Sequence, residues 1–182
     1  EQAIDLYLQA APQKDGRSAM EWQAPNGKSA FDDLIKFKRL SISNDRGEKY
    51  DGILYNSQEY YAAIEIELVK PDPNIIIALA YYSLNGGLLF VNNLLDTKQI
   101  SLDELQPGQY LLSARIPVEL FANGGCQLEV LCVIHTAGWV LPRDNGSRIK
   151  LEFFRDVDPT TEIALGVQQT LMPAIQWKVQ PI

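Results

Sequence analysis

Aromatic and amide side chains gather at the ends of two neighbouring apolar stretches. Tyr81 and Tyr82 lie near the end of the apolar run 75–84, and Asn92 and Asn93 end the next run, after an Asn-Gly-Gly turn that predicts a hairpin. An aromatic ring stacks on the C–H face of a sugar, while side-chain amides hydrogen-bond its hydroxyl groups. This combination indicates a surface that binds carbohydrate.

The two tyrosines must point to opposite faces of the predicted strand. Tyr81 shares a face with Ile75, Ile77 and Leu79, which predicts a position in the core. Tyr82 shares a face with Ala78 and Ala80, whose small side chains leave room for a shallow groove, so we expect Tyr82 to be the sugar-binding ring. The two asparagines fit a strand-end turn equally well.

A second group of candidates lies on and just after the predicted strand 126–136. Glu129 and His135 fall on its outward register, and Trp139 follows His135 by four residues. We expect Glu129 and His135 to contact sugar hydroxyls and Trp139 to stack on a ring; a hydrogen-bonded surface histidine and a core tryptophan are the alternatives. His135 has no serine or cysteine at a catalytic spacing, so nucleophilic catalysis is not predicted.

Carboxylates raise the question of a glycosidase, which needs a pair of them across the bond that it cleaves. Glu65 and Glu67 alternate with apolar residues along one predicted strand, a pattern typical of a solvated face. Asp156 and Asp158 could hold calcium, but two carboxylates in a loop are weak evidence for such a site. We therefore expect no metal, no cofactor and no enzymatic activity, with a small glycosidase as the weakest alternative.

Composition limits the classes of protein and partner. The chain has 182 residues, 46% hydrophobic and 21% charged, which suits one globular domain. Its net charge of −7 argues against nucleic acid and anionic membranes as partners and favours a neutral ligand or a protein. Cys126 and Cys132 would lie about 20 Å apart along one strand, too far for a disulfide, so we expect buried thiols in a reducing compartment.

The candidates must be positioned by many short strands, which predict an all-β antiparallel sandwich. The expected strands cover residues 34–43, 60–69, 75–84, 88–93, 110–116, 126–136, 139–141, 149–154, 163–167 and 174–179. We expect Asp144-Asn145-Gly146 to join strands 139–141 and 149–154 as a hairpin. Helical turns are expected at 101–104, which has capping-box spacing, and at 117–122. The first 11 residues have the spacing of an amphipathic helix, and residues 12–30, with Trp22, have the composition of a linker.

The order of several weak motifs resembles the C-terminal carbohydrate-binding domain of the ATPase subunit of O-antigen polysaccharide ABC transporters, the Wzt type. These motifs are a D-x-G turn, an Asn-Gly turn continuing into F-V-N-N, an L-x-P-G-x-Y run, and an I-P-x-x-L-F-x-x-G segment at 45–47, 85–93, 105–110 and 116–124. An A-I-D-x-Y-L string at 3–8 is similar to the helix that follows the nucleotide-binding domain in such ATPases. No G-x-x-x-x-G-K-S/T phosphate loop occurs in the chain.

This resemblance implies an immunoglobulin-like sandwich at 31–182, preceded at 1–30 by a helix and linker from an ATPase domain. It implies non-catalytic recognition, in the cytoplasm beside the inner membrane, of an undecaprenyl-linked polysaccharide, commonly through a modified terminus. It also implies a homodimer that exchanges the strand at 174–179, and a membrane permease as the partner of the ATPase. A sandwich that only holds two ATPase chains together is the structural alternative.

Overall fold

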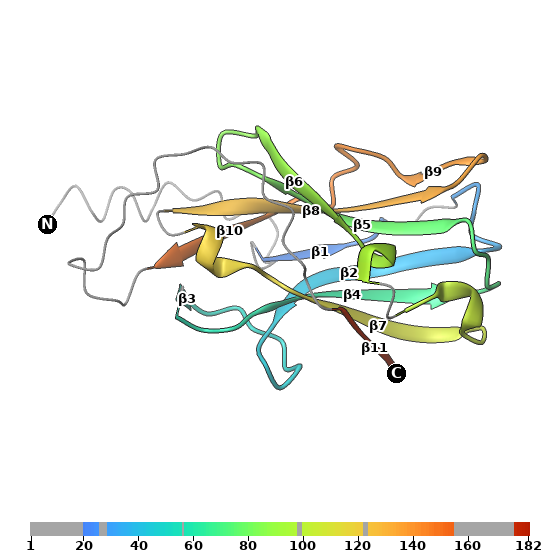
Figure 1. The fold of residues 1–182 in the computed structure, drawn as a ribbon, viewed down its shortest axis with the longest axis horizontal. Helices are drawn as coiled ribbons and strands as arrows, with labels where there is room; N and C mark the ends of the chain where they lie inside the picture. The colour runs from blue at the N-terminus through green and yellow to red at the C-terminus, as the bar shows by residue number, and fades with distance from the viewer. Residues whose placement is uncertain (1–19, 26–28, 56, 98–99, 122–123, 155–176) are drawn as a thin grey trace, which may run out of the picture.

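Two stacked sheets of mainly antiparallel strands form the protein, so the expected all-β sandwich is confirmed (Figure 1). The computed structural model describes residues 20–25, 29–55, 57–97, 100–121, 124–154 and 177–182. The first sheet has the strand order β1-β2-β4-β7-β11, and the second has the order β3-β10-β8-β5-β6, with β9 also paired to β8. The strands are β1 Glu21–Gln23, β2 Ile35–Ser43, β3 Leu54–Tyr55, β4 Tyr61–Leu68, β5 Ile75–Tyr82, β6 Leu88–Asn93, β7 Gly108–Arg115, β8 Gly124–Ile134, β9 Gly138–Leu141, β10 Ile149–Phe154 and β11 Trp177–Pro181.

Alternation of side chains decides which residues enter the core between the sheets. In β4 the inward positions, from Ala62 to Leu68, are fully buried, while Glu65 and Glu67 face outward. In β5 both faces are largely buried, as the continuous apolar run predicts. Burial of the apolar side chains of both inner faces is the main favourable term in folding.

Tyr81 enters the core, as expected, and joins an aromatic cluster there. Its ring stacks on Phe90 at a centroid distance of 4.4 Å, and Phe121 extends the stack to Phe153. The side chain is fully buried, and desolvation raises the pKa of its hydroxyl well above the ordinary value. Tyr81 is therefore unavailable to a ligand.

Strands β9 and β10 do not form the expected hairpin with each other. Both pair antiparallel with the same edge of β8, β9 opposite its end near Ile134 and β10 opposite its beginning. Residues 142–148 connect them and interrupt the strand that returns along β8. The interruption arises because Asp144 and Gly146 adopt positive φ angles of 57° and 85°, which turn the chain away from the ladder.

The stretch expected to be a linker contributes a strand to the sandwich. Trp22, in β1, is opposite Leu40 in the β1–β2 ladder and packs against the core. β3, which the sequence did not predict, pairs parallel with β10. Three residues with one aromatic side chain carry too little periodicity to be recognised as a strand, but an available sheet edge is enough to order them.

Two short 3₁₀ helices, Leu102–Glu104 and Val118–Phe121, confirm the expected helical turns, and a third spans Leu94–Thr97. The predicted capping box is not formed: the side chain of Ser101 makes no capping hydrogen bond and donates to the carboxylate of Asp103 instead. Among the described residues, no helix is long and apolar enough to cross a bilayer.

The last described strand, β11, lies at the edge of the first sheet beside β7. It runs from Trp177 to Pro181, so Pro181 lies inside the strand, opposite Tyr110, rather than after it. The first three residues of the expected strand 174–179, the expected strand 163–167, the expected helix at 1–11 and Asp156 and Asp158 lie outside the described residues.

Candidate functional site

A shallow hollow of about 170 Å³ lies on the outer face of the second sheet. Its apolar floor includes Ala78 from β5, Val91 from β6 and Leu131 from β8. Small and medium side chains on three adjacent strands leave this hollow, as the alanine face of β5 led us to expect. A polar and aromatic rim surrounds it, formed by Asn93, Trp139 and Arg143.

Trp139 presents an exposed aromatic surface at this hollow. It lies on β9 opposite Val133, and 54% of the residue is exposed to solvent. The short β9 strand holds the indole at the edge of the sheet, where it pairs with β8 and with no other strand of the described residues. An exposed, partly immobilised ring beside an apolar floor suits stacking on the C–H face of a sugar.

The two asparagines of β6 have different environments. Asn92 is opposite Leu79 and only 4% exposed, whereas Asn93 is opposite Ala78 and lines the hollow. Neither asparagine lies opposite a tyrosine, because Phe90 and Leu88 occupy those positions. Asn93 donates one amide hydrogen bond to Asp96, so its carbonyl oxygen and its second amide hydrogen can face a ligand.

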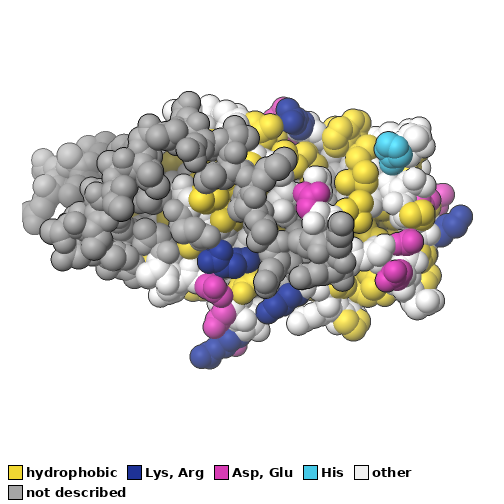
Figure 2. All heavy atoms as spheres, in the orientation of Figure 1, with side chains coloured by type: hydrophobic (Ala, Val, Ile, Leu, Met, Phe, Trp, Pro, Cys, Tyr) yellow, Lys and Arg dark blue, Asp and Glu magenta, His cyan; other side chains and the backbone are white. Residues whose placement is uncertain are grey.

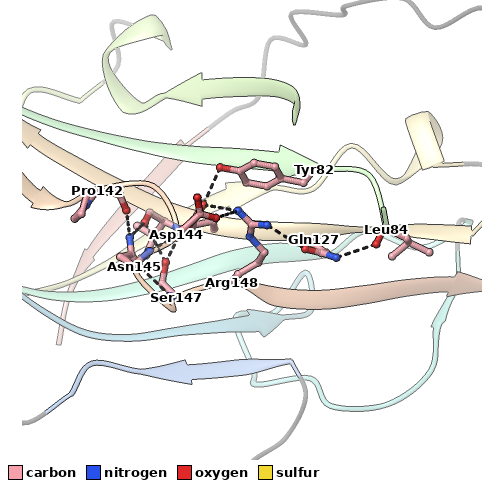
Figure 3. A network of polar contacts seen from close by, with 10 residues as sticks. Tyr82, Leu84, Gln127, Pro142, Asp144, Asn145, Ser147 and Arg148 are labelled. Atoms are coloured by element: carbon pink, nitrogen blue, oxygen red, sulfur yellow. Dashed lines mark hydrogen bonds and ion pairs between the residues drawn. The ribbon is translucent and has the colours of Figure 1, made fainter. Parts of the chain in front are cut away.

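Tyr82 and Glu129 form a buried hydrogen-bonded pair on this same outer face. Figure 3 shows the Tyr82 side chain beside Arg148 in the network around this pair. The Tyr82 hydroxyl donates to Glu129 Oε2 at 2.7 Å, and Arg148 Nη2 donates to the same oxygen at 3.2 Å. The Arg148 guanidinium also covers the Tyr82 ring at 3.9 Å from its centroid. Tyr82 is 4% exposed and Glu129 is fully buried, so both are covered from solvent by Arg148 and its loop.

Residues 142–148, which we call the arginine loop, are fixed on β8 by backbone and side-chain hydrogen bonds. Asn145 N donates to Glu129 Oε1 at 3.2 Å, and Asn145 Nδ2 donates to the Val130 carbonyl at 3.0 Å. Ser147 Oγ accepts from Val130 N and donates to the carbonyl of the same residue, at 3.2 and 3.1 Å. The loop side chains thus satisfy the backbone groups that the interrupted ladder leaves unpaired.

The charges of Arg148, Glu129 and Asp144 compensate one another within the network. Arg148 pairs with both Glu129 and Asp144, the latter at 2.6 Å, and Arg148 Nη1 lies 3.4 Å from Gln127 Oε1. Burial alone would lower the pKa of Arg148, but the hydrogen bond and charge of Glu129 raise it overall. Desolvation, and then the hydrogen bond to Glu129, raise the pKa of Tyr82, so its hydroxyl stays a donor.

His135 lies apart from this network. It follows the end of β8, its backbone N–H donates to the Asn74 carbonyl at 2.8 Å, and its side chain is exposed. Six residues of strand separate it from Glu129, a distance of about 20 Å. The structure therefore brings Tyr82 and Glu129 together and places Trp139 and Asn93 at one hollow, but it does not add His135 to either.

The sequence did not mark Arg143 and Arg148 as members of the site, although the structure places one at the hollow and the other on Glu129. An outward glutamate in an otherwise apolar strand needs a cation to be buried, and the i, i+4 pair of Asp144 and Arg148 marks one nearby. The hairpin expected at this turn would put its residues in solvent, so no local pattern paired these arginines with Glu129.

Glu65 and Glu67 form a solvated stripe, as expected. Glu67 pairs with Lys36 and Lys38 at 3.3 and 3.4 Å, and Glu65 pairs with Arg39. Both glutamates are on the outer face of the first sheet, whereas Glu129 is on the outer face of the second, so none of them can form a carboxylate pair with Glu129. Among the described residues no group of three potential ligands could hold a metal ion.

Basic and acidic side chains are mixed over the surface rather than separated. On the face that Figure 2 shows, Lys and Arg lie beside Asp and Glu, with hydrophobic side chains between them. The part of this face that the structure describes therefore presents no broad surface of one charge.

A larger hollow of about 780 Å³ lies where β1 and β2 approach β9. Lys36, Arg39 and Glu65 line it, and each is engaged in an ion pair of the solvated stripe. Its one aromatic side chain among the described residues, Phe37, is buried. Among its described lining residues it therefore lacks the exposed ring that the smaller hollow has.

Cys126 and Cys132 are buried free thiols on the inner face of β8, as expected. Burial raises the pKa of the Cys132 thiol to about 12 and raises that of Cys126 as well. Both therefore remain protonated and unreactive at neutral pH.

No family model and no curated protein matches this sequence. The structure, however, is similar to the crystal structure of the C-terminal domain of Wzt, with a TM-score of 0.50 and 11% sequence identity. The chain has the fold of the C-terminal domain of Wzt. The similarity covers 78% of this chain and 84% of that one, so the resemblance inferred from the sequence is confirmed at the level of the fold.

Proposed function

We propose that this chain is a non-catalytic carbohydrate-binding module of the ATPase subunit of a polysaccharide ABC transporter. It recognises a lipid-linked, O-antigen-type polysaccharide at its modified terminus, on the cytoplasmic side of the membrane, before export through the permease. The observation that carries this proposal is the exposed indole of Trp139 beside an apolar hollow with an amide rim. The fold shared with the C-terminal domain of Wzt supports the transporter assignment.

The rim residues divide the work of binding. Trp139 stacks on a sugar ring, whose apolar face it removes from water. Asn93 hydrogen-bonds a hydroxyl group through its carbonyl oxygen and free amide hydrogen. Tyr82 and Glu129 do not touch the sugar in this arrangement, because they are buried; they hold the arginine loop that borders the hollow.

Titration of the 182-residue chain with polysaccharide purified from the surface of the organism that makes it tests the proposal. We expect saturable binding, weakened roughly 5- to 30-fold in Trp139→Ala, because loss of a stacked ring costs on the order of 1–2 kcal/mol. Phe154→Ala is the matched control: this ring is 53% exposed on β10 but does not line the hollow. Absence of binding, or equal loss in both variants, would contradict the proposal.

The edge position of β11 favours a second role, in dimerisation. Two copies that exchange β11 would each keep its five-residue pairing with β7, so exchange needs no new interface chemistry. We propose this homodimer alongside carbohydrate binding. Sedimentation should give dimers for the whole chain and monomers after removal of residues 177–182, and monomers in both cases would refute the exchange.

A further inference from the structure

Arg143 differs from the other arginine of the loop in having no ion pair. Arg148 is neutralised by Glu129 and Asp144, whereas Arg143 makes no hydrogen bond or ion pair with the described residues. The neighbouring carboxylate of Asp144, which would otherwise be a natural partner of Arg143, is held at 2.6 Å from Arg148 Nη2. The buried network thus leaves one guanidinium of the arginine loop uncompensated.

This free guanidinium belongs to the rim of the hollow, together with Trp139 and Asn93. None of the described residues that line the hollow is acidic: Asp96, which accepts hydrogen bonds from Asn93 N and Nδ2, does not line it, and Asp144 is paired with Arg148. The local charge of the rim is therefore positive although the chain carries −7 overall. Salt screens charges beyond about 8 Å under physiological conditions, so the local guanidinium dominates at contact.

We propose that the hollow binds a sugar bearing an acidic group, either the carboxylate of a uronic acid or a phosphate ester, and that Arg143 receives that group. Arginine suits this role because its planar fork can donate two parallel hydrogen bonds to a carboxylate or a phosphate. Trp139 then stacks on the ring that carries the acidic group. This inference rests on the proposed carbohydrate binding and adds the class of ligand.

The arginine loop fixes where this charge lies. Asn145 N and Ser147 Oγ anchor the loop on β8 by hydrogen bonds to Glu129 and to the Val130 carbonyl. Arg143 therefore extends from a segment that is tied to the sheet. Pre-organisation of this kind reduces the conformational entropy lost on binding. Glu129 is accordingly a positioning residue.

Matched pairs of oligosaccharides test the proposal by calorimetric titration of the whole chain. One pair ends in glucuronic acid or in its carboxyl-reduced form, glucose; another ends in glucose 6-phosphate or in glucose. We expect the acidic member of at least one pair to bind roughly 10- to 100-fold more tightly, as for a charge-assisted hydrogen-bond pair. Comparison of the two pairs tells whether the acidic group is a carboxylate or a phosphate.

Variants assign the preference to one side chain. Arg143→Gln should abolish the preference, and Arg143→Lys should restore part of it. Arg46→Gln is the control: it removes the same charge from an exposed arginine that makes no ion pair with the described residues and does not line the hollow. This variant should keep the preference.

The outcomes separate the two proposals. Equal binding of acidic and neutral members, unchanged in Arg143→Gln but lost in Trp139→Ala, would overturn the acidic ligand and leave carbohydrate binding intact. Equal loss of the preference in Arg143→Gln and Arg46→Gln would also overturn the role of Arg143. Absence of binding to every member, in a chain that binds no purified polysaccharide either, would overturn both.

Discussion

The outer faces of the two sheets carry similar side chains in opposite environments. On the first sheet, Glu67 is 33% exposed and pairs with lysines, and Tyr61 lies 5.5 Å from the ammonium of Lys178. On the second sheet, Glu129 is fully buried, and the guanidinium of Arg148 lies 3.9 Å from the ring of Tyr82. Each face combines glutamate, tyrosine and a cation, but only the second face removes them from water.

The arginine loop accounts for this difference. On the first sheet β2, β4 and β7 pair along their lengths, and the side chains of Glu65 and Glu67 on the outer face stay partly exposed. On the second sheet the strand that pairs with β8 is interrupted at 142–148, and the loop covers Glu129. Coulomb attraction is much stronger in a buried environment than in water, and so is the penalty for a missing partner. Glutamate, tyrosine and a cation therefore form exposed pairs on the first sheet and a buried network that holds the arginine loop on the second.

The largest expected effect is the loss of the buried carboxylate. Glu129→Ala should lower the free energy of unfolding by about 3–5 kcal/mol, because it leaves Arg148, the Tyr82 hydroxyl and the Asn145 N–H without their acceptor. Glu67→Ala removes a carboxylate from the corresponding face of the first sheet and should cost at most about 1 kcal/mol, as exposed pairs do. Urea denaturation of both variants measures the difference.

Equal losses in these two variants would break the comparison between the faces. They would mean that the arginine loop does not seal Glu129 from water in solution. A change in the denaturant slope of one variant only would indicate that it alters the unfolded or native ensemble and not the contact alone.

A smaller effect should follow from removal of a single hydroxyl. Tyr82→Phe deletes the donor to Glu129 and leaves a buried acceptor with one partner fewer, so we expect a loss of about 1–3 kcal/mol. Tyr61→Phe is the counterpart on the first sheet, where the hydroxyl contacts Glu59 at 3.3 Å on the surface, and its effect should stay within about 0.5 kcal/mol. Thermal unfolding of the two variants compares them, and a larger loss in Tyr61→Phe would reverse the assignment of the buried face.

Most of the fold could be predicted from local pattern because strand alternation is a property of neighbouring residues. The spacing of β4 and the two-sided apolar run of β5 predicted their inward faces correctly, including Tyr81 in the core and Tyr82 outside it. Two failures concern strands that depend on partners: Glu21–Gln23, expected to be linker, and the β9–β10 hairpin. In both, a sheet edge distant in sequence supplied hydrogen bonds that the local residues could not reveal.

The sequence predicted several residues of the candidate site, but not which of them lie together. The sequence selected Tyr82, Asn93, Glu129 and Trp139 from their residue types, and all four lie on or beside the outer face of the second sheet. It could not separate the exposed rim from the buried network, since that division depends on what covers each side chain.

By itself, the sequence determined the sandwich, the inward and outward faces of its longer strands and the presence of aromatic, amide and carboxylate side chains on its outer faces, because alternation and residue chemistry are local. Only the tertiary structure decided that Glu129 and Tyr82 are buried and that Trp139 is exposed. It also decided that Arg148 is neutralised while Arg143 makes no ion pair with the described residues. These outcomes depend on the contact of the arginine loop with β8, which joins residues 144–148 to residues 129–130. Hydrogen bonds at the interruption of the β8 ladder determine this contact, and no local pattern in the sequence encodes it.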